Sequence, residues 1–273
     1  MPVSGATTVY GLAGDPVAHS LTPALHAAAF EALGLDAVSI ALRAAEPAAA
    51  TVVDAVRRLG IRALSVTMPL KEAVVAHCEE RTEVVARLHA ANCLVATVHG
   101  TVRADSTDGD GLLAAIACAH GPLRAPTCCV LGSGGAARAA IEALDRAGAT
   151  DVAVVARRDE AAAAAATVAR AARVGVPSDA LEADVVVQAT AVGMRDTEAA
   201  DAVPLVDGAR LRAGQVAVEL VYHPRVTPWL RGAASGGAAT VEGVEVLVHQ
   251  AHVALSRWLE SEVPIEALHA VAT

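Results

Sequence analysis

The apolar positions of the first hundred residues fall into short runs separated by helical segments. Runs typical of strands occupy residues 9–13, 38–42 and 63–67. Helical segments lie between and after these runs, at residues 22–33, 47–59, 71–78 and 82–89. A regular alternation of strand and helix predicts an α/β domain in which most strands are parallel.

The second half of the chain repeats this alternation. Its strand-like apolar runs lie at residues 128–131, 152–156, 185–188 and 216–220. Its helical segments lie at residues 112–120, 138–147, 160–173 and 244–259. We expect the last, amphipathic helix to return to the first domain, because it follows the last strand and a Ser-Gly-Gly break. The sequence therefore predicts two domains: residues 1–107, completed by 243–273, and residues 108–242.

Composition narrows the class of protein. A chain of 273 residues is long enough for two α/β domains. Although 54% of the residues are hydrophobic, no run of about 18 apolar residues is free of charges or turn residues, so no membrane-spanning helix is expected. The formal charge of −9 argues against nucleic acid as a partner. The N-terminus lacks a basic and apolar signal pattern, so we expect a cytoplasmic protein.

Cysteine and histidine spacing gives no metal signature. The five cysteines show no paired spacing, and adjacent Cys128 and Cys129 fit small core positions in a strand. His249 and His252 are three residues apart on a predicted helix, and we expect no carboxylate or cysteine to complete a ligand set there. We therefore expect no metal site.

A glycine-rich turn in the middle of the chain carries the strongest chemical signal. The apolar run 128–131 leads into Gly132-Ser133-Gly134-Gly135-Ala136-Ala137 and then into an alanine-rich helix. In this setting the glycines allow a tight turn and close approach of a pyrophosphate, while a small third residue lets helix and strand pack. The N–H groups at the helix start would hold the phosphates. The turn predicts a dinucleotide-binding domain that is preceded by a substrate domain.

Small polar clusters in the first half offer candidate substrate groups. Ser20 and Thr22 lie at a predicted helix start, where two hydroxyls and free N–H groups suit a carboxylate, although Thr22 alone also fits an ordinary N-cap. Lys71 lies just inside a helix after a strand that ends at Pro69, and a solvated surface lysine is the alternative. Asn92 follows a predicted helix, and Asp108 opens the crossing into the second domain; taken singly, each is typical of a capping or turn residue. Together these groups provide what an oxidoreductase of hydroxy acids needs.

Eight segments resemble, in order and across nearly the whole chain, motifs of the shikimate dehydrogenase family. The family motifs are H-S-x-S-P, N-V-T-x-P-x-K, N-T, N-T-D, a G-x-G-G turn, N-A-T-x-x-G-M, D-x-x-Y-x-P-x-x-T-P and a C-terminal Q-A. The matching segments are residues 19–23, 65–71, 92–93, 106–108, 132–135, 188–194, 219–228 and 250–251. The resemblance implies an α/β substrate domain, a Rossmann-like NAD(P)-binding domain and a final helix that returns to the substrate domain.

The resemblance also implies a role for individual residues. The catalytic pair would be Lys71 and Asp108. The substrate-binding residues would be Ser20, Thr22, Thr67, Asn92, Tyr222 and Gln250. The cofactor-binding residues would be Gly132, Ser133, Gly134, Gly135, Ala136, Arg157, Arg158, Asp159, Thr190, Met194, Leu220 and Gly243.

The implied activity is NAD(P)-dependent interconversion of 3-dehydroshikimate and shikimate by hydride transfer, in aromatic amino acid biosynthesis. The partner is then a small cyclic hydroxy acid, with no nucleic acid or membrane, and the chain is a monomer or a homodimer. Several positions depart from the family pattern: Ser65, Ser106 and Gln188 replace asparagines, Cys93 replaces threonine and Glu219 replaces aspartate. A paralogue that acts on quinate or on an aminated analogue such as aminoshikimate or aminoquinate is therefore an alternative. A non-catalytic dinucleotide-binding regulator and a Rossmann enzyme for another substrate, such as a folate intermediate, are further alternatives.

The predicted cofactor is NADP, with NAD as the alternative. Arg157 and Arg158 follow the second strand of the nucleotide domain, where guanidinium groups favour a 2′-phosphate. Asp159 could instead accept from the ribose hydroxyls of NAD. A solvated charged turn would explain the same residues without any cofactor.

Overall fold

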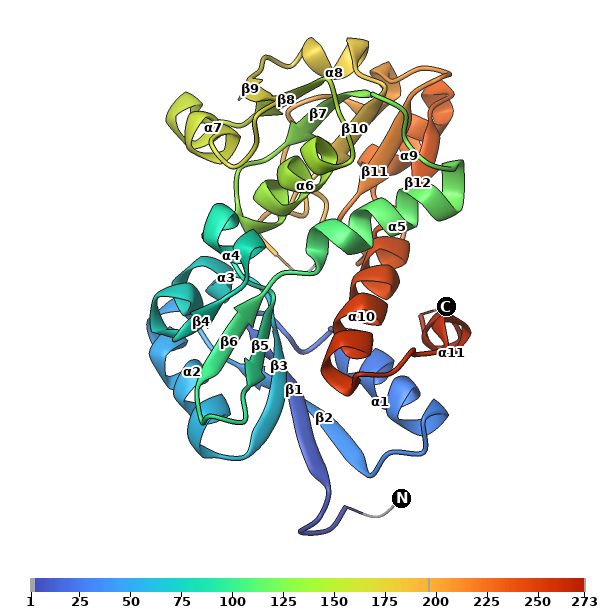
Figure 1. The fold of residues 1–273 in the computed structure, drawn as a ribbon. Helices are drawn as coiled ribbons and strands as arrows, with labels where there is room; N and C mark the ends of the chain where they lie inside the picture. Colours follow the sequence, from blue (N-terminus) through green and yellow to red (C-terminus); the bar gives the residue numbers. More distant parts are fainter. Residues whose placement is uncertain (1–2, 196, 273) are drawn as a thin grey trace. The chain divides into compact units, whose positions relative to one another are not determined.

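The computed structural model describes residues 3–195 and 197–272, which include every predicted site residue. The chain divides into two compact units. The first comprises Met1–Thr107 and Gln250–Thr273, and the second comprises Asp108–His249. The helix α10 (Gly243–Leu259) contributes its first seven residues to the second unit and the remainder to the first. Each unit contains one six-stranded sheet with helices packed on it (Figure 1).

The sheet of the first unit is mixed, with the strand order β2-β1-β3-β5-β6-β4. Its strands are β1 (Thr8–Gly14), β2 (Ala37–Arg43), β3 (Ile61–Val66), β4 (Glu80–Arg81), β5 (Cys93–Ala96) and β6 (Val102–Asp105). The strand β1 pairs in parallel with β2 and β3, as the alternation predicts. The prediction missed β5 and β6, which form an antiparallel hairpin beside β3. Each of these two strands has only four residues, too few to establish a period in the sequence.

The helices of the first unit lie between or after its strands in the chain. They are α1 (Thr22–Ala32), α2 (Ala49–Arg58), α3 (Leu70–Ala73), α4 (Glu83–Leu88) and α11 (Ile265–His269), with short 3₁₀ turns η1 (Glu46–Ala48) and η2 (Val74–His77). The helices α1 and α2 pack against this sheet, and the short helix α11 packs against α1. The helix predicted over residues 71–78 is thus one α-helical turn followed by a 3₁₀ turn. Val53 of α2 packs into one apolar cluster with Leu64 of β3 and Leu94 of β5. This cluster holds the carboxyl end of β3 beside the amino end of β5.

The sheet of the second unit is parallel throughout, with the order β12-β11-β10-β7-β8-β9. Its strands are β7 (Thr127–Leu131), β8 (Asp151–Val155), β9 (Ala172–Val174), β10 (Val185–Gln188), β11 (Val216–Glu219) and β12 (Ala239–Val241). The four predicted strands are confirmed, but β9 and β12 were not predicted. The helix predicted over residues 160–173 ends at Ala166, and Ala172–Val174 pairs with β8 instead. Pairing along a sheet edge outweighs the helix propensity of Ala172 and Arg173 in this segment.

The helices of the second unit begin with α5 (Asp108–His120), which starts four residues earlier than predicted. The others are α6 (Gly135–Arg146), α7 (Asp159–Ala166), α8 (Asp179–Glu182), α9 (Pro228–Gly236) and the 3₁₀ turn η3 (Gly208–Arg210). Gly109 allows α5 to pack closely on α6, because a Cβ there would lie 2.8 Å from the carbonyl oxygen of Ala139. In the part of the chain that is described, every helix is too short or too polar to cross a bilayer.

Candidate active site

Asn92 is the centre of a buried hydrogen-bonded cluster in the first unit. Its side chain is 4% exposed and lies just before β5. The Asn92 amide Nδ2 donates to Gln250 Oε1 and to Thr107 Oγ1, at 3.0 Å in each case. Its Oδ1 accepts the backbone N–H of Thr107 at 2.8 Å. Two predicted substrate residues, Asn92 and Gln250, are therefore in direct contact, and Thr107 fixes the asparagine side chain from the other side.

Backbone hydrogen bonds place Lys71 and Thr67 beside this cluster. The carbonyl of Lys71 accepts the N–H of Ala91 at 2.8 Å, and the carbonyl of Asn92 accepts the N–H of Val66 at 2.7 Å. Thr67 follows directly after β3 and donates its N–H to Ala13. Lys71 is half-buried in the first turn of α3. Backbone hydrogen bonds between the end of β3 and the start of β5 thus bring residues 67 and 71 close to Asn92. The side chain of Asn92 in turn contacts Gln250.

Ser20 and Thr22 lie at the start of α1, where the local geometry differs from an ordinary threonine cap. The N-cap residue is Leu21, and Thr22 is the first residue inside the helix, 4% exposed. The N–H of Thr22 donates to Ser20 Oγ at 3.2 Å. The interpretation of Thr22 as the capping side chain is therefore wrong, since Ser20 supplies the acceptor that the helix start uses.

A buried histidine that the sequence analysis did not single out holds Ser65 at the end of β3. His26 is fully buried; its Nδ1 lies 2.8 Å from Ser39 Oγ and its Nε2 lies 3.4 Å from Ser65 Oγ. Burial lowers the pKa of His26 to about 3, so the ring is neutral and each nitrogen takes one hydrogen-bonding role. Only the tertiary structure reveals this link, because residues 26 and 65 are far apart in the sequence.

The glycine turn of the second unit has the predicted strand–turn–helix form. Gly132 has a φ of +131° and donates its N–H to the carbonyl of Val155, which joins the turn to β8. Gly134 is the N-cap of α6, and a Cβ built on it would meet no atom within 4 Å. Ala137 is fully buried, as expected of the small third position. Open space over the N–H groups of a helix of 12 residues fits a pyrophosphate.

The charged residues that follow β8 are exposed to solvent. Arg157, Arg158 and Asp159 are exposed, and Arg158 is the N-cap of α7. None of the three has a side-chain hydrogen bond or ion pair with another residue that the structure describes. The turn between Val155 and α7 therefore exposes two guanidinium groups that have no partner among the described residues. This turn directly follows Val155, whose carbonyl accepts the N–H of Gly132.

Polar side chains at the carboxyl ends of β10 and β11 hold the turns that follow these strands. Gln188 Oε1 accepts from the N–H and the O–H of Thr190, at 3.2 and 2.7 Å. The Gln188 Nε2 is buried with no hydrogen-bond partner among the described atoms. Met194 closes a turn by donating its N–H to Ala191. Thr190 and Met194 thus lie on a loop that a buried amide anchors.

Glu219 organises the turn after β11. Its Oε1 accepts the N–H groups of Leu220 and Val221, at 2.9 and 3.0 Å, and its Oε2 accepts the O–H of Thr227 at 2.7 Å. Burial raises the pKa of Glu219 to about 7, and these three hydrogen bonds oppose the rise. The turn holds Leu220 and the half-buried Tyr222. Gly243 packs directly against this turn, where any side chain would collide with the Val221 carbonyl.

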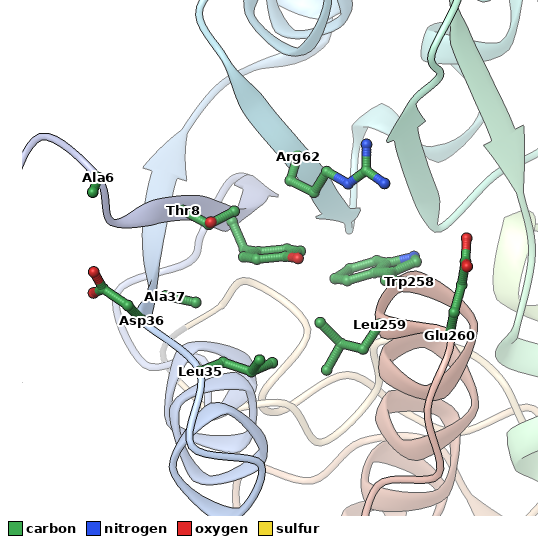
Figure 2. A pocket seen from close by; sticks show the side chains of 10 residues that line it. Ala6, Thr8, Leu35, Asp36, Ala37, Arg62, Trp258, Leu259 and Glu260 are labelled. Carbon is green, nitrogen blue, oxygen red and sulfur yellow. The ribbon is translucent and has the colours of Figure 1, made fainter.

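A pocket of about 520 Å³ lies elsewhere in the first unit. It is lined by residues at the amino ends of β1, β2 and β3 and at the end of α10, including Thr8, Ala37 and Trp258. Figure 2 shows the side chains of Arg62 and Trp258 at this pocket. Because Thr67 and Ser65 lie at the carboxyl end of β3, this pocket is not the predicted substrate site.

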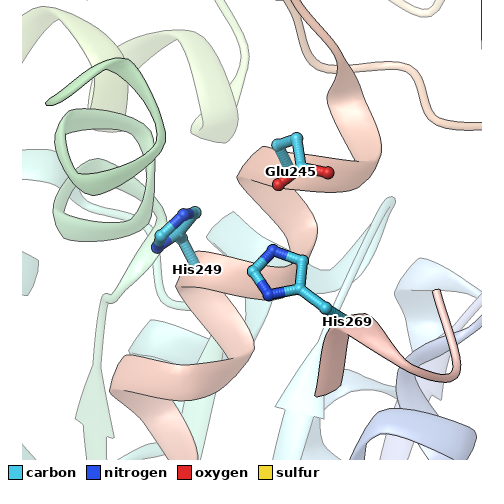
Figure 3. Close-up of side chains that lie close together, drawn as sticks. All are labelled: Glu245, His249 and His269. Atoms are coloured by element: carbon cyan, nitrogen blue, oxygen red, sulfur yellow. The ribbon is translucent and has the colours of Figure 1, made fainter. Parts of the chain in front are cut away.

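The helix α10 carries two ligand-type side chains one turn apart. Glu245 and His249 occupy successive turns of α10, as Figure 3 shows, while His269 stands on the short helix α11 of the first unit. A protein metal site generally needs three or four ligands. The expectation that no carboxylate accompanies His249 on this helix is wrong, because Glu245 lies one turn before it. The absence of a metal stays a prediction.

The fold and these clusters define a class of protein. A parallel sheet whose central strand leads through a glycine turn into a helix, in a chain that also contains a separate α/β unit, is typical of two-domain dinucleotide-dependent oxidoreductases. Residues 12–94 match the family model of the shikimate dehydrogenase substrate binding domain. The chain is 38% identical to the shikimate dehydrogenase (NADP(+)) of Caulobacter vibrioides over 91% of this chain and 88% of the relative. The chain belongs to the shikimate dehydrogenase family.

Solved structures agree in fold. The shikimate 5-dehydrogenase of Thermus thermophilus, solved with NADP(H) and shikimate, superposes with a TM-score of 0.87 at 33% identity, covering 97% of this chain and 98% of that one. The quinate dehydrogenase of Corynebacterium glutamicum, solved with NAD, superposes with a TM-score of 0.86 at 26% identity and the same coverage. The two-domain α/β fold class predicted from the sequence is confirmed.

Proposed function

We propose that this chain interconverts 3-dehydroshikimate and shikimate with NADP as the cofactor. The observation that carries the proposal is the buried Asn92–Thr107–Gln250 cluster beside Lys71. This cluster offers amide and hydroxyl groups for ring hydroxyls at the end of a sheet, next to a lysine. The first unit then binds the substrate and the second binds the dinucleotide. Similarity to NADP-dependent shikimate dehydrogenases over nearly the whole chain supports the same assignment.

Lys71 is the proposed proton donor. When bound, the nicotinamide supplies the hydride that reduces the ring ketone. Lys71 Nζ then gives one proton to the oxygen that becomes the alcohol, and its positive charge stabilises that oxygen beforehand. Asp108 orients the lysine and the substrate hydroxyl; it follows Thr107 directly in the chain, and Thr107 is held by Asn92. In the reverse direction neutral Lys71 takes the same proton from the alcohol.

The remaining substrate groups are assigned by their chemistry. Ser20 and Thr22 hold the carboxylate with hydroxyl groups at a helix start, where backbone dipoles add positive potential. The ring hydroxyls are bound by Thr67, Asn92, Tyr222 and Gln250. The cofactor is held by the open glycine turn at Gly134 and by the loop that Gln188 anchors.

The choice of NADP rests on the two unpaired guanidinium groups of Arg157 and Arg158. Guanidinium groups bind phosphate through paired, charge-assisted hydrogen bonds, so a 2′-phosphate would satisfy both. Asp159 follows them in the chain and offers an acceptor for the ribose hydroxyls of NAD, which we propose as the weaker binding mode. The five cysteines are thiols and not disulfides, which suits the reducing cytoplasm as the proposed compartment.

A second candidate substrate is quinate. Ser65 and Ser106 stand where the family has asparagines, so the surroundings of the ring are shaped by shorter side chains. Ser65 is additionally held by His26. The structural similarity to a quinate dehydrogenase at 26% identity supports keeping this candidate.

A kinetic matrix tests the proposal. Initial rates are measured for shikimate and quinate, each with NADP and with NAD. We expect the largest kcat/KM for shikimate with NADP. A larger value for quinate would favour the second candidate. No turnover of either acid, with dinucleotide binding retained, would contradict the proposed function and favour a regulator.

A further inference from the structure

The pocket of about 520 Å³ in the first unit is lined by two aromatic side chains whose polar atoms are unused. Tyr10 and Trp258 are only 5% and 7% exposed. Neither the Tyr10 hydroxyl nor the Trp258 indole N–H forms a hydrogen bond with a residue that the structure describes. Neither atom is among those that the protein encloses without a partner, so both are open to the pocket. The pocket therefore offers two hydrogen-bond donors to a ligand.

Two opposite charges border the same pocket without meeting each other. Arg62 lies near the start of β3, and Glu260 directly follows α10. Both residues line the pocket, and neither forms an ion pair with a residue in the described part of the chain. Burial raises the pKa of Tyr10 and the positive charge of Arg62 opposes this rise, so Arg62 lies near the unused hydroxyl. Figure 2 shows the side chains of Arg62 and Glu260 around the indole ring of Trp258.

The backbone conformation of Glu260 sets this residue apart from an ordinary helix end. Its φ is +49°, in the left-handed region. Glycine is usual where a helix ends in this conformation, because it has no Cβ to strain the backbone. The helix end therefore does not explain a glutamate at this position, whereas a binding role for its carboxylate does.

An apolar wall faces the charged groups in this pocket. Leu35 and Leu259 contribute side chains to it, and Leu35 is 38% exposed. The rings of Tyr10 and Trp258 are stacked, with an interplanar angle of 12° and centroids 6.2 Å apart. Trp258 also packs edge-on against the buried His26, which holds the indole in place. A pocket of this size lies in the range of about 300–1,000 Å³ that is typical of small-molecule sites.

We propose that this pocket binds a free α-amino acid with a hydrophobic side chain, its carboxylate at Arg62 and its ammonium group at Glu260. A simple carboxylic acid would leave Glu260 facing a like charge, and a simple amine would do the same to Arg62. An α-amino acid carries both charges on one carbon atom, and its side chain covers the apolar wall. The site uses none of the residues assigned to substrate or cofactor, so it stands whether or not the proposed function is correct.

Titration calorimetry of the full chain with L-phenylalanine tests the proposal. For a ligand of this size we expect a dissociation constant of about 1 mM or below. N-acetyl-L-phenylalanine lacks the ammonium group and L-phenylalaninamide lacks the carboxylate, so each should bind roughly tenfold more weakly or worse. Absence of saturable binding of both L-phenylalanine and L-leucine up to about 10 mM would overturn the proposal. Equal binding of the two blocked compounds would also overturn it.

Substitutions locate the site. Arg62→Gln and Glu260→Gly should each weaken binding of L-phenylalanine roughly tenfold or more, because each removes one charge-assisted contact. Arg103→Gln removes an exposed arginine on β6 outside the pocket and should bind as the unaltered chain does. Glu260→Gly relieves the left-handed backbone, so its melting temperature should not fall and its weaker binding cannot come from unfolding. Binding that survives both pocket substitutions would place the amino acid elsewhere and contradict the proposal.

Discussion

The Nδ2 of Asn92 donates to Oε1 of Gln250 across 3.0 Å, although 158 residues separate the two in the chain. The contact ties the start of β5 to α10, so the C-terminal helix completes the polar cluster of the first unit. Both amides are then fixed in one orientation by their neighbours.

Asn92→Ala should lower both stability and substrate binding. The change leaves the N–H of Thr107 and the Oε1 of Gln250 without their partner in a buried setting. An unsatisfied buried polar group costs about 1–3 kcal/mol. We expect a lower free energy of unfolding in urea and a raised KM for the acid. Unchanged values of both would show that water replaces the amide without loss.

Lys71→Ala should lower kcat by roughly 10²–10⁴-fold, because general acid–base groups contribute by about this factor. The dissociation constant of the nucleotide should stay nearly the same. Lys71→Arg is the matched control: it keeps the charge but holds its proton too tightly to transfer it, so its kcat should also fall. Near-normal turnover in either variant would remove Lys71 from proton transfer.

Ser20→Ala and Thr22→Val should raise KM for the acid if both hydroxyls hold its carboxylate. Loss of one hydrogen bond to a charged group costs about 1.5–3 kcal/mol, or at least tenfold in KM. Ser20→Ala should in addition lower the melting temperature, because Ser20 accepts the Thr22 N–H. Thr22→Ser keeps the hydroxyl and serves as the control. A loss of stability with unchanged KM would rule out the carboxylate site.

Replacement of Arg157 and Arg158 by alanine should weaken NADP binding at least tenfold more than NAD binding, because only NADP carries the 2′-phosphate. Fluorescence titration with each nucleotide measures the ratio. Replacement of Arg210 and Arg212 by alanine removes two other exposed arginines of the same unit and controls for net charge. Equal losses for both nucleotides would show that this turn does not recognise the phosphate.

Glu219 should make stability depend on pH. Its pKa of about 7 in the folded chain exceeds the ordinary value of 4.5. A raised carboxyl pKa gives a contribution that is fully present below pH 4.5 and is lost as the pH rises through 7. From about pH 4.5 to about pH 8.5 the unaltered chain should therefore lose about 3 kcal/mol of unfolding free energy relative to Glu219→Gln. Urea denaturation at several pH values measures this difference, and a constant difference would contradict it.

Local sequence determined the glycine turn that is proposed to bind the nucleotide. The strand β7, the turn at Gly132–Gly135 and the helix α6 are contiguous, so the glycine pattern and the apolar run were enough to predict their geometry. The parallel strands β1, β2 and β3 were predictable for the same reason, because each is long enough to show its apolar run.

Tertiary structure alone decided the rest. The segments β5, β6 and β9 become strands because a neighbouring strand supplies their hydrogen bonds, and their three or four residues carry no pattern of their own. The neutral state of His26 and the raised pKa of Glu219 come from burial by residues distant in the chain. The contact of Asn92 with Gln250 depends on where α10 packs. A sequence specifies local conformation directly, whereas desolvation and long-range hydrogen bonds exist only after the chain has folded.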